Sequence, residues 1–277
     1  MKIYNSLSGI FIEQNGEFTL ASIQDWDQLV NEPNLHDFLK NDFSKAEKVS
    51  GKPSELLAPV GSQEIWAAGV TYFRSREARM EESKESGAAV FYSKVYEAER
   101  PELFFKSTPG RVAEPGGKVL IRKDSKWNVP EPELTLFVNS NHQIAGYTVG
   151  NDMSSRDIEG ENPLYLPQAK CYDRSAAIGP CLWVPAQPID PDAKIHMSIE
   201  RNWKTVFEGQ ISINQMKRKH QELVGFLTRE MSFPQGAYLM TGTCLVPDNS
   251  FSLQVGDIIH IEIDGIGTLS NTVDKKA

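Results

Sequence analysis

The sequence is poor in cysteine and histidine and has no long apolar run. Its 277 residues include three cysteines and five histidines, and the absence of any CxxC or HxxxH pattern excludes the usual zinc motifs. Widely spaced cysteines in odd number are typical of free thiols, so we expect a cytoplasmic protein. No stretch approaches the roughly 18 apolar residues of a membrane span, and the first residues lack the apolar core of a signal peptide. We therefore expect no membrane association.

Positive charge is also scarce. The chain has 29 Lys and Arg residues against 37 Asp and Glu residues, which gives a net charge of -8. Nucleic-acid binding requires a basic stripe that neutralises phosphates, so we expect no nucleic-acid partner. No GxGxxG motif supports a dinucleotide site. The composition, 40% hydrophobic and 24% charged, is that of an ordinary globular protein.

The hydrophobic pattern divides the chain into two parts. Residues 1–58 combine short strand-like runs with a stretch, 25–43, that has the 3.6-residue spacing of a helix. We therefore expect a small N-terminal α/β domain over 1–58. Residues 50–63 contain two prolines and two glycines, as linkers do. A larger domain is expected over 59–277.

The larger domain is expected to consist mainly of strands. The stretches 71–85 and 214–230 are rich in helix formers and are expected to be helices. Many strands with few intervening helices disfavour a doubly wound fold, so the expected fold class is α+β. Short β-like runs separated by Gly, Pro, Asn and Asp occur at 64–70, 103–107, 118–122, 132–139, 144–152, 177–185, 194–201, 237–243 and 257–264.

Two glutamates open the strand-like run VPEPELTLF, residues 129–137. Glu131 and Glu133 are two positions apart, so in an extended chain both carboxylates project to the same face. Such pairs are also common on solvent-facing sheets. A third carboxylate, Asp152, ends the run AGYTVGND where turn residues begin, a position typical of active-site groups. Three ionised carboxylates that meet need a cation, and oxygen ligands select Mg²⁺, with Mn²⁺ or Ca²⁺ also possible.

Several motifs between residues 64 and 274 resemble those of the fumarylacetoacetate hydrolase superfamily and occur in the same order along the chain. They are PEPELTLF, GYTVGNDMSSRD, Lys170 followed nine residues later by Gly-Pro, and MTGTCLVP before VGDIIHIEIDGIGTLSNTV. The resemblance implies a mixed β-sandwich roll and a homodimer or a dimer of dimers.

The same resemblance implies roles for individual residues. It makes Glu131, Glu133 and Asp152 the ligands of a Mg²⁺ ion. It makes Lys170 the active-site lysine and Thr243, in the TGT motif, a substrate contact.

The sequence departs from the C–C bond hydrolases of this superfamily near its start. Those enzymes carry a histidine three residues after a tyrosine, and it activates the attacking water together with a glutamate. Here Ser75 stands three residues after Tyr72, which disfavours hydrolysis. Arg74 and Ser75 belong to a polar stretch that suits an anionic, hydroxylated substrate, so both are candidate substrate contacts.

Two stretches, VYEAERPELFFKS and RDIEGENPLYLPQAK, resemble a narrower branch, the 2-keto-3-deoxy-pentonate dehydratases. That resemblance implies dehydration of a 2-dehydro-3-deoxy-D-pentonate, from arabinonate or xylonate, to 2,5-dioxopentanoate. A Mg²⁺ ion with three protein ligands keeps positions open for a 2-keto acid. Two alternatives stay open: a hydrolase of acylpyruvates or other 1,3-diketo acids, and a non-catalytic sensor of sugar acids.

Four further side chains are candidates for the chemistry. Lys170 is the candidate base, because burial and a nearby dication can keep a lysine neutral; alternatively, it pairs structurally with the metal carboxylates. Glu102 is the candidate acid for the departing hydroxyl, or a solvent-facing glutamate. Lys106 and Arg156 are candidates for binding the substrate carboxylate, or surface cations.

Overall fold

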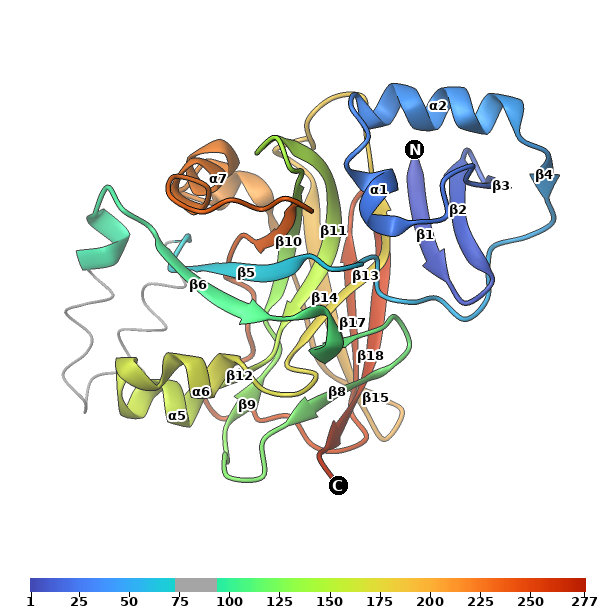
Figure 1. The fold of residues 1–277 in the computed structure, drawn as a ribbon. Coiled ribbons are helices and arrows are strands. Elements are labelled where there is room, and N and C mark those ends of the chain that lie inside the picture. The colour runs from blue at the N-terminus through green and yellow to red at the C-terminus, as the bar shows by residue number, and fades with distance from the viewer. Residues whose placement is uncertain (73–93) are drawn as a thin grey trace.

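The computed structural model describes residues 1–72 and 94–277 (Figure 1). Two sheets dominate it and the helices are short, which confirms the α+β class predicted from the sequence. Among the described residues, no helix is long and apolar enough to cross a membrane. The helix predicted over 71–85 falls almost entirely outside the described residues.

The larger sheet has eleven strands. In spatial order its path is β4 (Lys48–Val49), β3 (Glu17–Leu20), β2 (Gly9–Gln14), β1 (Lys2–Ser6), β13 (Ala176–Trp183), β11 (Ile144–Asp152), β10 (Pro132–Val138), β16 (Ala237–Met240), β5 (Glu64–Gly69) and β6 (Glu102–Ser107), with β7 (Val112–Ala113) paired to β13. Neighbouring strands are mostly antiparallel, but β16 pairs with β5 in parallel.

The second sheet has five strands and packs against the first. Its order is β15 (Lys204–Ser212), β14 (Lys194–Arg201), β17 (Ile258–Ile263), β18 (Gly267–Lys275) and β8 (Lys118–Ile121). Strands β10, β11 and β13 contact β14, β17 and β18. A short pair, β9 (Asn128–Val129) with β12 (Ser154–Ser155), lies beside the sandwich.

Strand β10 is buried along its whole length because both of its faces are covered. Leu134 and Leu136 face the second sheet and belong to the same apolar cluster as Ile261 of β17. Phe137 faces the other way, into a cluster that includes Leu29 and Leu39 of the N-terminal helices. This double burial explains why the strand reads as a nearly continuous apolar run.

The N-terminal residues form strands β1 to β4 and helices α1 (Trp26–Val30) and α2 (Leu35–Lys45) at one end of the larger sheet (Figure 1). Strand β1 pairs with β13, so the backbone hydrogen bonds continue into the rest of the sheet. Whether 1–58 acts as a domain of its own stays a prediction.

Two predicted helices are shorter in the structure. The stretch 25–43 is two helices, α1 and α2, because Pro33 cannot donate within a helix and Asn34 is left-handed, with φ of 51°. The stretch 214–230 contains α7 (His220–Leu227) as its only α-helix. Its first part is instead tied to residues 71–72, since the Lys217 N–H donates to the Thr71 carbonyl and Met216 bridges Tyr72.

Candidate active site

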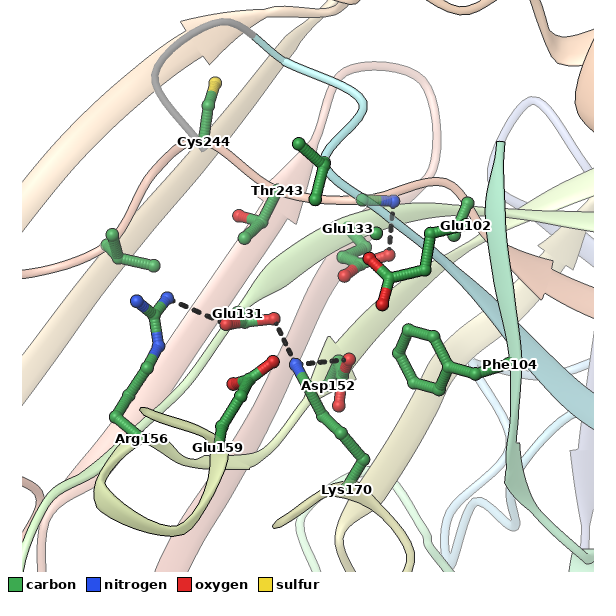
Figure 2. A pocket seen from close by; sticks show the side chains of 15 residues that line it. Glu102, Phe104, Glu131, Glu133, Asp152, Arg156, Glu159, Lys170, Thr243 and Cys244 are labelled. Carbon is green, nitrogen blue, oxygen red and sulfur yellow. Dashed lines mark hydrogen bonds and ion pairs between the residues drawn. The ribbon is translucent and has the colours of Figure 1, made fainter. Parts of the chain in front are cut away.

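Antiparallel pairing of β10 and β11 brings the three predicted carboxylates together. Glu131 directly precedes β10, Glu133 is its second residue and pairs with Gly150, and Asp152 ends β11. The Asp152 N–H donates to the Glu131 carbonyl at 2.9 Å, which closes the corner. Each of the three residues offers a carboxylate oxygen, and these atoms lie within 4.8 Å of one another. All three side chains are buried (Figure 2).

Two cations contact the triad from the short helices α5 (Arg156–Glu161) and α6 (Leu166–Lys170). The Lys170 ammonium donates to Glu131 Oε2 at 2.7 Å and to Asp152 Oδ2 at 3.0 Å (Figure 2). Its third bond goes to Ser154 Oγ at 2.6 Å. The Arg156 guanidinium donates to Glu131 Oε1 at 2.8 Å. Lys170 is therefore next to the carboxylates, as its motif predicted.

A third cation, Lys106 of β6, is completely buried. Its ammonium forms an ion pair with Asp152 Oδ1 and donates to the Met153 carbonyl at 3.0 Å and the Lys170 carbonyl at 2.5 Å. All three of its donors are thus used by protein acceptors. Lys106 is not among the residues that line the pocket. These contacts indicate that Lys106 holds Asp152 and the end of α6 in place. Its predicted contact with the substrate stays a prediction.

The two lysines keep Asp152 ionised. Burial alone disfavours its charged form, but the ammonium groups of Lys106 and Lys170 outweigh burial and hold the pKa of Asp152 below its ordinary value. Because each lysine takes a different carboxylate oxygen, the side chain is fixed in orientation.

Glu133 has a different environment. Its Oε2 accepts the Gly242 N–H at 2.5 Å, and no cation among the described residues forms an ion pair with it. Burial, followed by the charges of Asp152 and Glu131, raises the pKa of Glu133 well above its ordinary value. The protein alone thus disfavours a charge that a bound cation would stabilise. Three buried carboxylates, one of them in this state, fit a hard divalent cation that takes oxygen ligands.

The triad lies in a pocket that other elements complete (Figure 2). Glu102 and Phe104 project from alternate positions of β6 into the wall, and Glu102 pairs in register with Gly69 of β5. A Cβ atom at Gly69 would lie 2.0 Å from Glu102 Oε2, so the glycine leaves room for this carboxylate. The predicted acid therefore lines the pocket; its role in proton transfer stays a prediction.

The predicted substrate contacts differ in position. Arg156 and Thr243 both line the pocket. Thr243 directly follows Gly242, whose φ of +95° lets the chain turn there while its N–H reaches Glu133. Arg74 and Ser75 lie outside the described residues.

Sequence reasoning missed Glu159, a buried glutamate that lines the pocket from helix α5. Figure 2 shows its carboxylate on the side of the triad away from Glu102. It stands three residues after Arg156, and residues so spaced share one face of a helix. The motif RDIEG therefore contained a signal, but the sequence alone did not indicate a helix there.

The chain was then compared with known proteins. Residues 65–274 match the protein family described as fumarylacetoacetate (FAA) hydrolase C-terminal. A protein of Haloferax volcanii named "Probable 2-keto-3-deoxyxylonate dehydratase" is 51% identical over 216 residues, which cover 78% of this chain and 73% of that protein. The "2-dehydro-3-deoxy-D-arabinonate dehydratase" of Saccharolobus solfataricus is 42% identical over 224 residues, 80% of this chain and 75% of that protein.

Solved structures show the same relationship. A structure described as "2-keto-3-deoxy-D-arabinonate dehydratase complexed with magnesium and 2,5-dioxopentanoate" aligns with a TM-score of 0.85 at 32% identity, covering 100% of this chain and 99% of that one. Another 2-keto-3-deoxyarabinonate dehydratase structure aligns with a TM-score of 0.87 at 34% identity, over the whole of both chains. The β-sandwich roll expected from the sequence is thus confirmed.

Proposed function

The chain belongs to the fumarylacetoacetate hydrolase family, and we propose that within it the protein is a Mg²⁺-dependent dehydratase of 2-keto-3-deoxy sugar acids. Its substrate is a 2-dehydro-3-deoxy-D-pentonate, from arabinonate or xylonate, and its products are 2,5-dioxopentanoate and water. One observation carries the proposal: three buried carboxylates and Lys170 converge in one pocket. Similarity to two dehydratases at 42–51% identity supports it.

The residues that hold the metal are Glu131, Glu133 and Asp152. The donor set is all oxygen. Burial and two neighbouring carboxylates raise the pKa of Glu133, and a bound dication would stabilise its charged form. When bound, Mg²⁺ supplies Lewis acidity toward the carboxylate and keto group of a 2-keto acid.

Two side chains of the pocket carry the proton transfers. Lys170 Nζ donates to Glu131 and Asp152 at 2.7–3.0 Å. Its extra proton is lost more readily when the triad holds a dication, and the neutral amine then accepts the proton that leaves C3 of the substrate. Glu102, which lines the pocket from strand β6, donates a proton to the C4 hydroxyl, which leaves as water. A proton then leaves C5 and one returns to C3, which gives an enol across C4 and C5. Protonation of C4 with loss of the C5 hydroxyl proton converts this enol into the aldehyde. No oxidant is needed, because the elements of one water are the only loss.

Substrate recognition falls to the remaining polar groups of the wall. Arg156 lines the pocket and donates to Glu131, so it places positive charge in the wall that suits the substrate carboxylate. Thr243 offers a hydroxyl in the pocket wall. Arg74 and Ser75 are retained as candidate contacts from the sequence alone.

The proposal extends to assembly, location and domain organisation. We propose a homodimer or a dimer of dimers, on the family resemblance. A cytoplasmic location is supported by three free cysteines. A division into a small domain, 1–58, and a catalytic domain, 59–277, is supported by the position of α1 and α2 at one end of the larger sheet (Figure 1).

A coupled assay tests the function. The protein is incubated with 2-dehydro-3-deoxy-D-arabinonate and, separately, with an acylpyruvate, each with Mg²⁺ or with EDTA. A semialdehyde dehydrogenase reports any 2,5-dioxopentanoate as NAD(P)H. We expect aldehyde from the sugar acid only, and only with Mg²⁺. Pyruvate from the acylpyruvate without aldehyde from the sugar acid would replace this proposal with C–C bond hydrolysis.

A further inference from the structure

Arg218 lies outside the pocket and forms hydrogen bonds with the backbone of residues 95–99, which precede strand β6. It is buried at 7% exposure, in the loop before α7. Its guanidinium donates to three backbone carbonyls: those of Val95 at 3.2 Å, Ala98 at 2.5 Å and Glu99 at 2.9 Å. One arginine therefore supplies donors to three backbone carbonyls within residues 95–99.

Arg218 is itself fixed by helix α7. It pairs with Glu222 at 2.6 Å, one helical turn later. The other carboxylate oxygen of Glu222 accepts the Lys219 N–H at 3.3 Å, at the start of the helix. Because α7 buries Leu223, Val224 and Leu227 in the core, the guanidinium is anchored to a packed element.

The same loop also holds the end of β5. The Lys217 N–H donates to the Thr71 carbonyl at 2.9 Å, and the Thr71 hydroxyl donates to the Thr241 carbonyl at 2.7 Å. The Lys217 ammonium donates to the Tyr96 carbonyl. Residues 216–218 thus connect the chain just after β5 with the chain just before β6.

The two segments that residues 216–218 bind both lie next to residues of the pocket wall. Gly69 is two residues before Thr71, and Glu102 is three residues after Glu99. Gly69 and Glu102 are paired in register, and both line the pocket. Pro101 stands between the gripped carbonyls and Glu102, and its fixed φ makes this link stiff.

We propose that Arg218 is a positioning residue that sets the place of Glu102 in the pocket by holding the backbone of residues 95–99. It touches neither substrate nor metal. This inference rests on the proposed function, because Glu102 matters only if it takes part in the reaction.

The test is a double-mutant cycle between Arg218→Met and Glu102→Gln, with dehydration rate and Mg²⁺ affinity measured for each protein. Arg218→Met should lower kcat by about 10- to 100-fold, as expected when a reacting group is misplaced by an ångström or so. Its Mg²⁺ affinity should match wild type, since the triad lies on β10, on β11 and at the residue just before β10. In the Glu102→Gln background, the same change should cost less than about twofold, because the group it positions is already gone.

Two further variants separate positioning from general damage. Arg201→Met removes a partly buried arginine of β14, in the second sheet, that binds Asp257 and the Ser252 carbonyl, and it should keep kcat. Arg218→Lys keeps the charge with fewer donors, so its kcat should lie between those of wild type and Arg218→Met. If Arg218→Met does not fold, the cycle is run with Arg218→Lys.

Hydrogen exchange of the amides of residues 102–107 supplies a readout that needs no activity. We expect faster exchange in Arg218→Met and unchanged exchange in Arg201→Met. Additive losses of kcat in the cycle, or unchanged exchange in β6, would overturn the positioning role. Absence of aldehyde with the wild-type protein would overturn the proposed function instead, and the exchange measurement would still decide the role of Arg218.

Discussion

Replacing Glu133 with glutamine should have opposite effects on the protein with and without Mg²⁺. The amide keeps the shape of the side chain and an oxygen that can accept the Gly242 N–H. It removes one of the three carboxylates that define the proposed metal site. Without metal, the loss of a buried charge should stabilise the fold; with metal, the loss of a ligand should remove binding and activity.

Glu133→Gln should stabilise the metal-free protein because the pKa of Glu133 is raised in the folded state. In the unfolded chain this carboxyl ionises near its ordinary value of 4.5. Above that pH the folded state holds the proton longer, so stability of the wild type falls as pH rises through the raised pKa. Each pKa unit is worth about 1.4 kcal/mol, and each kcal/mol shifts the Tm of a large domain by about 2–4 °C. Glu133→Gln should remove this loss and raise the metal-free Tm at pH 7 by at least about 2 °C.

With Mg²⁺ bound, Glu133→Gln should lower the Tm relative to the wild type. At a Mg²⁺ concentration of about one hundred times Kd, binding stabilises the wild type by about 2.7 kcal/mol, or about 5–10 °C. Loss of even an outer partner of a metal site costs about 10–100-fold in affinity. A hundredfold loss would leave the variant with a Mg²⁺-dependent shift of about 1 °C.

Differential scanning calorimetry from pH 5 to pH 8, with EDTA or with Mg²⁺, measures all four states. Glu262→Gln is the control, because Glu262 is an exposed glutamate on strand β17; it should leave both the Tm values and the dehydration rate unchanged. The reasoning fails if Glu133→Gln lowers the metal-free Tm at pH 7, or if it keeps the wild-type Mg²⁺ shift and rate.

Lys170→Met should lower the dehydration rate by about 10²–10⁴-fold and keep the Mg²⁺-dependent rise in Tm, because no carboxylate is removed; steady-state rates and thermal melts measure the two effects. Gly69→Ala should also slow the reaction, since its Cβ would displace the Glu102 carboxylate, while isothermal titration shows unchanged Mg²⁺ binding. Gly225→Ala is its control: with no atom within 4 Å, it should keep the rate and stabilise α7 by about 0.5–1 kcal/mol. Light scattering should return a multiple of 31.0 kDa, and the mass of one chain at micromolar concentration would contradict the proposed dimer.

The carboxylate cluster could be predicted because strand geometry is regular. The two-residue spacing of Glu131 and Glu133 fixes a common face, and Asp152 ends a second strand. The antiparallel pairing of these strands then brings the three side chains together, as expected. That they bind the metal stays a proposal, although the structure contains the geometry it requires.

The surroundings of Lys106 could not be predicted from the sequence. It ends the apolar run LFFK, and such a lysine can extend to solvent, enter a pocket or be buried. Which of these occurs depends on Asp152, Met153 and Lys170, all distant in sequence. Local pattern carries no information on such contacts, so the sequence left Lys106 as a candidate for the substrate carboxylate or a surface cation.

Contacts between residues distant in sequence also made one of the helix boundaries unpredictable. Apolar spacing over 25–43 hid the break at Pro33, although a proline is itself a signal of interruption. The stretch 214–230 has good helix formers throughout, but its first residues bind residues 71–72 and 95–99 instead. Tertiary hydrogen bonds overrode local propensity there.

The most direct test of the proposed reaction is ¹³C NMR of labelled 2-dehydro-3-deoxy-D-arabinonate incubated with the protein and Mg²⁺. We predict loss of the C4 carbinol signal, appearance of an aldehyde signal at C5 and retention of all five carbons in one molecule, with no change when EDTA replaces Mg²⁺. Unchanged substrate in the presence of Mg²⁺, or carbon signals that separate into two smaller molecules, would contradict a metal-dependent dehydration.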